Sequence, residues 1–199
     1  MMKVNPMKHC FALPIVLIFL SLPAVVEATD CREWSNFSTN EEYLEPISFT
    51  PAALVSELNK SSYSNGLQIS ISENGSELWM DITRFPGDAA VVTATAAIMK
   101  VGRLVNHDFD ILVLSDGESA IFQIVEPVAR EIGCQFIWGR EGGQNPIHLM
   151  RILMRNLQHY ETGSFVSDGF TGHLLGDTTL AMDINNQILI PDWAMSALD

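Results

Sequence analysis

The chain has 199 residues, of which 47% are hydrophobic and 18% are charged, a composition that excludes a disordered protein and predicts one globular domain. Acidic residues outnumber basic ones by 24 to 11, which gives a net charge of -13 at pH 7. Because phosphate backbones and anionic lipids attract cationic proteins, this charge argues against binding to nucleic acid or to a membrane surface.

Residues 1–28 have the three parts of a secretory signal peptide. Two lysines precede an apolar stretch over residues 11–26, and small residues at Val26 and Ala28 suit a cleavage site. A retained membrane anchor is the alternative, but this stretch is short and contains two prolines, whereas a membrane-spanning helix needs roughly 20 apolar residues. We therefore expect an exported protein, periplasmic or secreted, with no membrane segment after cleavage and a single domain over residues 29–199.

Cleavage would leave two cysteines, Cys31 and Cys134. In an oxidising compartment two remaining thiols predict one disulfide, which would tie the N-terminal segment to the body of the domain. The alternative is two separate buried thiols. The cysteines are too far apart in sequence for a C-x-x-C metal motif, so we expect no metal site.

The first half of the body predicts a helix and then a hairpin. Thr50 suits the N-cap and Pro51 the first helical position, and apolar residues at helical spacing follow. Polar and apolar residues alternate over 67–72 and over 78–83, as in strands with one buried face. The pair Asn74 and Gly75 between them is typical of a two-residue hairpin turn, whose positions need positive φ.

The middle of the chain predicts a long helix over 88–105, rich in alanine, and a second hairpin. The strands of this hairpin are expected at 111–114 and 120–125, with the turn at Asp116 and Gly117. The run over 111–114 is apolar without interruption, which favours a strand that is covered on both faces.

The remaining segments predict a short helix over 127–132 that ends at Gly133, and a strand over 136–138. A third hairpin is expected over 180–190, with its turn at Asn185 and Asn186, and a terminal helix over 193–198. These elements predict an α+β fold with a mostly antiparallel sheet, built from hairpins with two-residue turns and packed on one face or both by helices.

The strongest candidate for a functional site is the segment from Arg140 to Tyr160. Asn145 suits an N-cap and Pro146 a first helical position, and apolar residues then mark one face of a helix that continues to Tyr160. Basic and histidine side chains fall on the opposite face, and Arg140 precedes the helix. The predicted binding residues are Arg140, His148, Arg151, Arg155 and His159.

A cationic helix edge on an acidic protein is typical of a surface that binds an acidic protein partner or a small anionic ligand. The alternative is that these side chains pair with the chain's own carboxylates on a solvated helix face. The sequence contains no G-x-S-x-G, H-E-x-x-H or phosphate-loop motif, so we expect no cofactor and favour a binding protein over an enzyme.

The predicted function is therefore that of an exported soluble accessory or binding domain. A small exported hydrolase or lyase is the alternative, and it would require Glu141, His148 and Asp168 to converge in the fold. A third interpretation is an assembly subunit.

Overall fold

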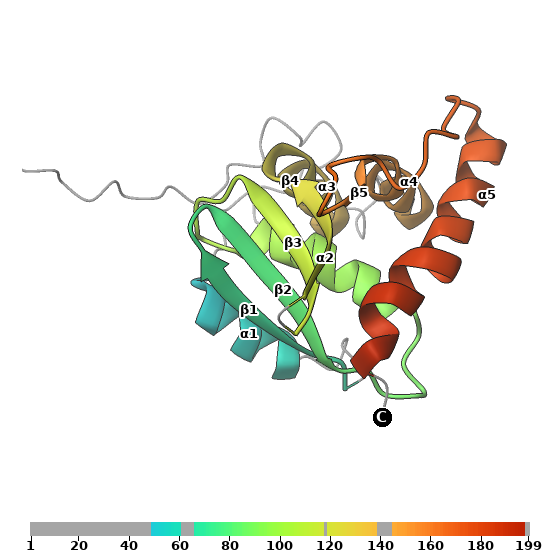
Figure 1. Ribbon diagram of the computed structural model, residues 1–199. Helices are drawn as coiled ribbons and strands as arrows, with labels where there is room; N and C mark the ends of the chain where they lie inside the picture. The colour runs from blue at the N-terminus through green and yellow to red at the C-terminus, as the bar shows by residue number, and fades with distance from the viewer. Residues whose placement is uncertain (1–48, 61–65, 118, 139–144, 198–199) are drawn as a thin grey trace, which may run out of the picture.

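The computed structural model describes residues 49–60, 66–117, 119–138 and 145–197, and it shows an α+β fold around one five-stranded sheet (Figure 1). The predicted signal peptide, Cys31, Arg140 and Glu141 lie outside these residues. No helix within the four described ranges is both long and apolar enough to cross a membrane.

The sheet is mixed, with its strands in chain order. The strands are β1 (Gln68–Asn74), β2 (Glu77–Arg84), β3 (Ile111–Asp116), β4 (Ser119–Val125) and β5 (Gln158–His159). Among these strands β2 and β3 are parallel, and the other neighbouring pairs are antiparallel. A parallel pair needs a long crossover connection, and the helix between β2 and β3 provides it. The prediction of a mostly antiparallel sheet is confirmed.

The first two predicted hairpins are present as antiparallel strand pairs. Asn74 pairs with Glu77 at the end of β1 and β2, and Asp116 pairs with Ser119 at the end of β3 and β4. Gly75 and Gly117 have positive φ values of 64° and 59°. Glycine has no Cβ to oppose this conformation, which explains its place beside each strand end.

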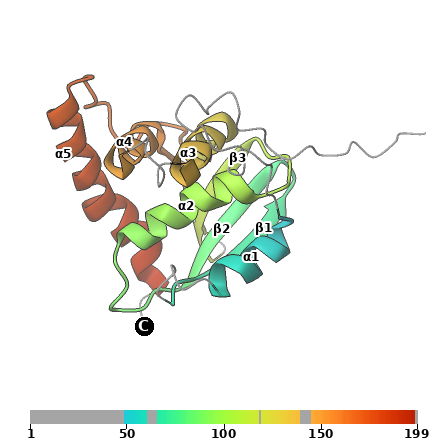
Figure 2. The ribbon, with the colours of Figure 1, turned by 180° about the vertical axis from the view of Figure 1, so that it is seen from behind.

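Helices α1, α2 and α3 lie on one face of the sheet, as the view from behind shows (Figure 2). Near the C-terminus the chain continues from α5 directly into a π-helical segment, η5, and then a 3-10 turn, η6. The helical elements are α1 (Pro51–Lys60), α2 (Val92–Leu104), α3 (Glu126–Trp138), α4 (Pro146–Asn156), α5 (Leu174–Ile184), η5 (Asn185–Ala194) and η6 (Met195–Ala197).

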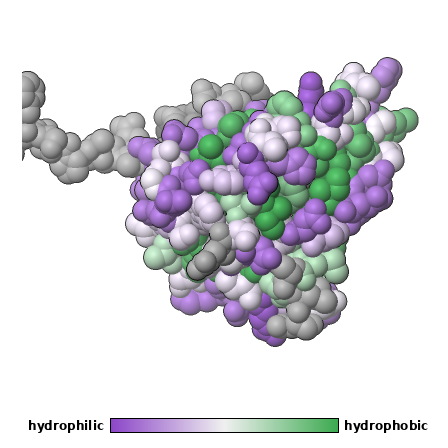
Figure 3. All heavy atoms as spheres, viewed as in Figure 1, coloured by the Kyte–Doolittle hydropathy of each residue, from purple (hydrophilic) through white to green (hydrophobic). Residues whose placement is uncertain are grey.

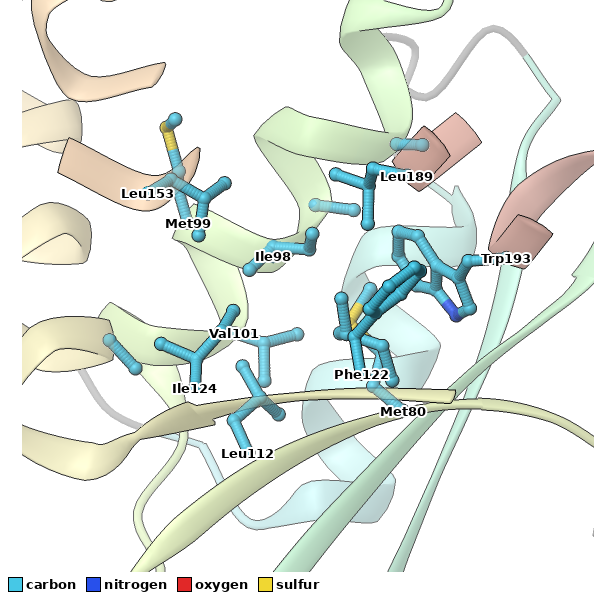
Figure 4. Close-up of a cluster of buried hydrophobic side chains, with 14 of the residues drawn as sticks. Met80, Ile98, Met99, Val101, Leu112, Phe122, Ile124, Leu153, Leu189 and Trp193 are labelled. Carbon is cyan, nitrogen blue, oxygen red and sulfur yellow. The ribbon is translucent and has the colours of Figure 1, made fainter. Parts of the chain in front are cut away.

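The hydrophobic core fills the space between the sheet and these helices (Figure 4). Alternate residues of the strands point into it, as the amphipathic pattern predicts. Burying each such side chain stabilises the fold by about 1.5–3 kcal/mol. Fully or almost fully buried members are Met80, Leu112, Phe122 and Ile124 from the sheet, Ile98 and Val101 from α2, and Leu189 and Trp193 from η5.

Small residues let α2 and α3 approach each other closely. A Cβ atom on Gly102 would lie 2.3 Å from the carbonyl oxygen of Ala129, and one on Gly133 would lie 2.5 Å from the backbone nitrogen of Arg103. Real Cβ atoms do not come this close to backbone, so both positions require glycine. The sequence predicted that Gly133 ends a helix, but α3 continues through this glycine to Trp138. Gly133 instead allows α2 and α3 to pack closely.

Buried polar groups fix the ends of the helices. The guanidinium of Arg130 donates to the carbonyl oxygens of Gly102, Val105 and His107 at 3.1, 2.8 and 2.9 Å, which satisfies acceptors at the end of α2. Burial lowers the pKa of Arg130, and its hydrogen bond with Glu126 opposes this shift. Farther along, the hydroxyl of Thr95 on α2 donates to the side-chain oxygen of Asn185 on η5 at 2.7 Å.

Several predicted elements are wrong. The third hairpin is absent, since residues 174–194 form the continuous helix α5–η5 in which Asn185 is buried rather than at a turn. The predicted strand over 136–138 belongs to α3, and α2 begins at Val92 instead of residue 88. The alternation of apolar residues over 180–184 suggested a strand, but so short a pattern is also compatible with one side of a helix.

Candidate functional site

Helix α4 begins as the sequence predicts. The side-chain oxygen of Asn145 accepts the backbone N–H of Ile147 at 3.0 Å, and Pro146 occupies the first turn. Leu149 and Leu153 bury the apolar face. The helix ends at Asn156, so the prediction that it continues to Tyr160 is wrong. The chain turns extended at the next residue and forms β5, whose pairing with β4 outweighs the helical periodicity.

His148, Arg151 and Arg155 lie at i, i+3 and i+7 on the side of α4 away from the core, and we call them the α4 basic edge. The first two are half-buried and Arg155 is exposed. His159 is not part of this edge. It lies in β5, where the centroid of its ring is 5.6 Å from the centroid of the Phe122 ring. Arg140, also predicted, lies outside the described residues.

The two arginines of the edge differ in their surroundings. Neither has a carboxylate oxygen within 4.0 Å in the part of the chain that the structure describes. Asp177 on α5 accepts backbone N–H groups from Thr171 and Gly172, each at 2.9 Å. The Thr171 hydrogen bond is the largest cause of its lowered pKa, and the charge of Arg151 adds to the effect. The charges of Arg151 and Asp177 therefore attract each other without an ion pair, whereas Arg155 is exposed to solvent.

An apolar groove lies beside the N-terminal end of α4. Its walls come from α2, α3 and α4 and include Val92, Met99, Phe136, Ile147 and Met150. Val92 is 58% exposed and Ile147 is 43% exposed. Ile147 stands four residues before Arg151, so the groove and the α4 basic edge adjoin on the surface of one helix.

The residues proposed for hydrolysis are not brought together within the described ranges. His148 and Asp168 make no hydrogen bond or ion pair with each other there, and Glu141 lies outside them. Among the same residues no group of three His, Cys, Asp or Glu side chains could hold a metal ion. Cys134 is completely buried in α3, and its predicted partner Cys31 is outside the described ranges.

The sheet face opposite the helices carries a second constellation, which sequence reasoning missed. The carboxylate of Glu77 accepts the indole N–H of Trp79 at 2.8 Å and the hydroxyl of Tyr160 at 3.0 Å. The two rings meet edge to face with centroids 6.0 Å apart. Strand alternation could have placed Glu77 and Trp79 on this face. Tyr160 could not be placed, because the sequence assigned it to a helix.

Three comparisons, with family models, with curated proteins and with solved structures, give no match to this chain. The geometry of its own surfaces is therefore the basis for assigning a function.

Proposed function

We propose that this protein is an exported, soluble, non-catalytic binding domain that docks an acidic protein partner or a small anionic ligand on the α4 basic edge. The observation that carries the proposal is that Arg151 and Arg155 have no ion-paired carboxylate within 4.0 Å among the described residues, in a chain of net charge -13. With acidic side chains in such excess, arginines outside ion pairs are the cations best able to receive an external carboxylate.

The surroundings of the edge support this assignment. The N-terminal end of a helix attracts negative charge, so the start of α4 adds to the field of its arginines. The adjoining apolar groove offers contact to hydrophobic side chains of the same partner. Arg140, which precedes α4 in the chain, would supply a further contact to the anion.

Export and the disulfide belong to the same proposal. Residues 1–28 would direct the chain out of the cytoplasm, and a Cys31–Cys134 bridge would anchor the segment before α1 to α3. The complete burial of Cys134 supports a structural role for this side chain. Intact mass before and after reduction and alkylation tests the bridge, since two cysteines that alkylate without reduction would disprove it.

The binding proposal is tested with poly-L-glutamate as the acidic probe, measured by fluorescence anisotropy at low salt. The double variant Arg151→Gln with Arg155→Gln removes two positive charges and keeps the side chains polar. Each lost contact is worth about 0.5–1 kcal/mol, so we expect binding to weaken by about tenfold.

Lys60→Glu on α1 is the matched control. It changes the net charge by the same amount, and Lys60 is an exposed side chain on a different helix. The control should bind like the natural protein. Equal weakening in both variants would mean that only total charge matters, and unchanged binding in the double variant would remove the α4 basic edge as the site.

A further inference from the structure

The face of the sheet opposite α1, α2 and α3 is largely hydrophilic. In the space-filling view from this side, purple and white residues dominate over the strands (Figure 3). The pairing register places one row of side chains across all five strands on this face. From β1 to β5 this row is Ser72, Trp79, Val113, Gln123 and Gln158.

The side chains of this row pack against one another and against Tyr160. Val113 is fully buried, although it does not belong to the core between the sheet and the helices. Its neighbours in the row are Trp79 and Gln123, and Tyr160 packs against the Trp79 ring. Gln123 in turn donates to Gln158 at 2.9 Å. These contacts hold Trp79, which is half-buried, in a fixed position.

Two carboxylates flank this tryptophan on the same face of β2. Glu77 precedes Trp79 by two residues and Asp81 follows it by two. Neither carboxylate has a cation within 4.0 Å in the described part of the chain. The donors to Glu77 are the neutral Trp79 and Tyr160, so they orient the carboxylate without cancelling its charge. We call Glu77, Trp79 and Asp81 the β2 stripe.

We propose that the β2 stripe docks a basic segment of a partner protein in extended conformation. Charge complementarity determines this choice, because the stripe presents two carboxylates. Among the strand residues that the register describes, the one Lys or Arg on this face is Arg84, which stands at the end of β2 opposite Gln68. The carboxylates of Glu77 and Asp81 would repel nucleic acid and other polyanions.

The spacing of the stripe fits such a segment. Residues four apart in a strand are separated by about 13 Å, and those two apart by about half of this. An extended peptide laid along β2 with Lys or Arg at i, i+2 and i+4 therefore places its outer cations at Glu77 and Asp81. Its middle cation lies over Trp79, where the face of an indole ring attracts positive charge.

The experiment measures anisotropy of a labelled peptide with four Lys-Thr repeats, with the purified protein at low salt. A peptide with glutamate in place of lysine is the negative probe. We expect the lysine peptide to bind, its affinity to fall as salt is added, and the glutamate peptide to show no binding. Equal binding of the two peptides would overturn the proposal.

The decisive variant is Glu77→Gln with Asp81→Asn, which keeps the shape of both side chains and leaves an amide oxygen at position 77 to accept hydrogen bonds. We expect at least a tenfold loss of affinity. The matched control, Glu57→Gln with Asp192→Asn, makes the same change in net charge at exposed positions of α1 and η5. Unchanged binding in the first variant, or equal loss in both, would overturn the proposal.

A second measurement locates the peptide directly. Carbodiimide couples a lysine amine to a carboxylate only when the two groups are in contact, and mass spectrometry identifies the coupled residues. Coupling concentrated at Glu77 and Asp81 supports docking on the β2 stripe, and coupling spread over carboxylates elsewhere on the protein would contradict it. The α4 double variant, Arg151→Gln with Arg155→Gln, should couple as the natural protein does, which separates this surface from the α4 basic edge.

Discussion

The two faces of the sheet are stabilised by different interactions. Toward α1, α2 and α3 the strands present a continuous apolar layer. On this side α2 and α3 pack so closely that the residues at their contact must be glycine or alanine. On the opposite face a few polar and aromatic side chains hold each other through the Glu77 carboxylate and the Gln123–Gln158 pair. The helix side therefore contributes most of the stability, whereas the opposite face presents charged and aromatic side chains in fixed orientations.

The largest effect on stability is expected at the contact between α2 and α3. Gly102→Ala would place a methyl group 2.3 Å from the carbonyl oxygen of Ala129, and backbone must shift to accept it. We expect a loss of about 3 kcal/mol in the free energy of unfolding, measured by urea denaturation.

Gly176→Ala is the control, because a Cβ atom there meets nothing within 4 Å. This exposed position lies inside α5, so alanine should stabilise the fold by about 0.5–1 kcal/mol through its higher helix propensity. If Gly102→Ala were as stable as the natural protein, close packing would not be what defines the helix side.

Thr95→Val tests the buried hydrogen bond between α2 and η5. Valine keeps the shape of threonine but leaves the Asn185 side-chain oxygen without the hydroxyl that donates to it at 2.7 Å. An unsatisfied buried acceptor costs about 1–3 kcal/mol, which thermal unfolding would detect. Thr179→Val on the exposed side of α5, where the threonine hydroxyl donates to the helix carbonyl of Leu175, should change stability much less.

A smaller effect is expected for Tyr160→Phe on the opposite face. This change removes the hydroxyl that donates to Glu77, and the free energy of unfolding should fall by about 0.5–1 kcal/mol. The hydrogen bond to Glu77 also raises the pKa of Tyr160. Its contribution to stability is therefore present below the ordinary tyrosine pKa of about 10 and is lost as the pH rises above it. In an ultraviolet titration, Glu77→Gln should lower the pKa of Tyr160, and an unchanged pKa would contradict this coupling.

The smallest effect concerns Asp81. Burial is the largest cause of the raised pKa of this carboxyl. The backbone N–H of Gly117 opposes the shift, and the charge of Asp116 adds to it. A raised pKa means that the fold favours the protonated acid, so stability is lost as the pH rises through this pKa. Asp81→Asn should stabilise the fold at pH 7 by no more than about 0.5 kcal/mol, because water screens a half-exposed carboxylate. This gain should vanish near pH 2, where both proteins are neutral at position 81, and a gain that persists there would exclude ionisation as its cause.

Prediction from the sequence succeeded where a local pattern had one structural meaning. The turns near Gly75 and Gly117 and the cap at Asn145 depend on residues that are neighbours in the chain. The prediction failed over 180–190, where the alternation of apolar residues suggested two strands. The structure has a helix there, and this helix buries Asn185 and Trp193. The candidate site was predicted in part for the same reason: His148, Arg151 and Arg155 share a helix edge, whereas β-pairing removed His159 from it.

The sequence by itself determined the acidic charge, the first two hairpin strand pairs and the basic edge of α4, because charge, turn conformation and helical spacing are local properties. Only the tertiary structure decided which sheet face the helices cover and which side chains meet on the other. Tyr160 reaches Glu77 across 83 positions of sequence, and such a contact depends on how the strands are ordered in the sheet. No local pattern encodes that order, since it results from packing the whole chain around one core.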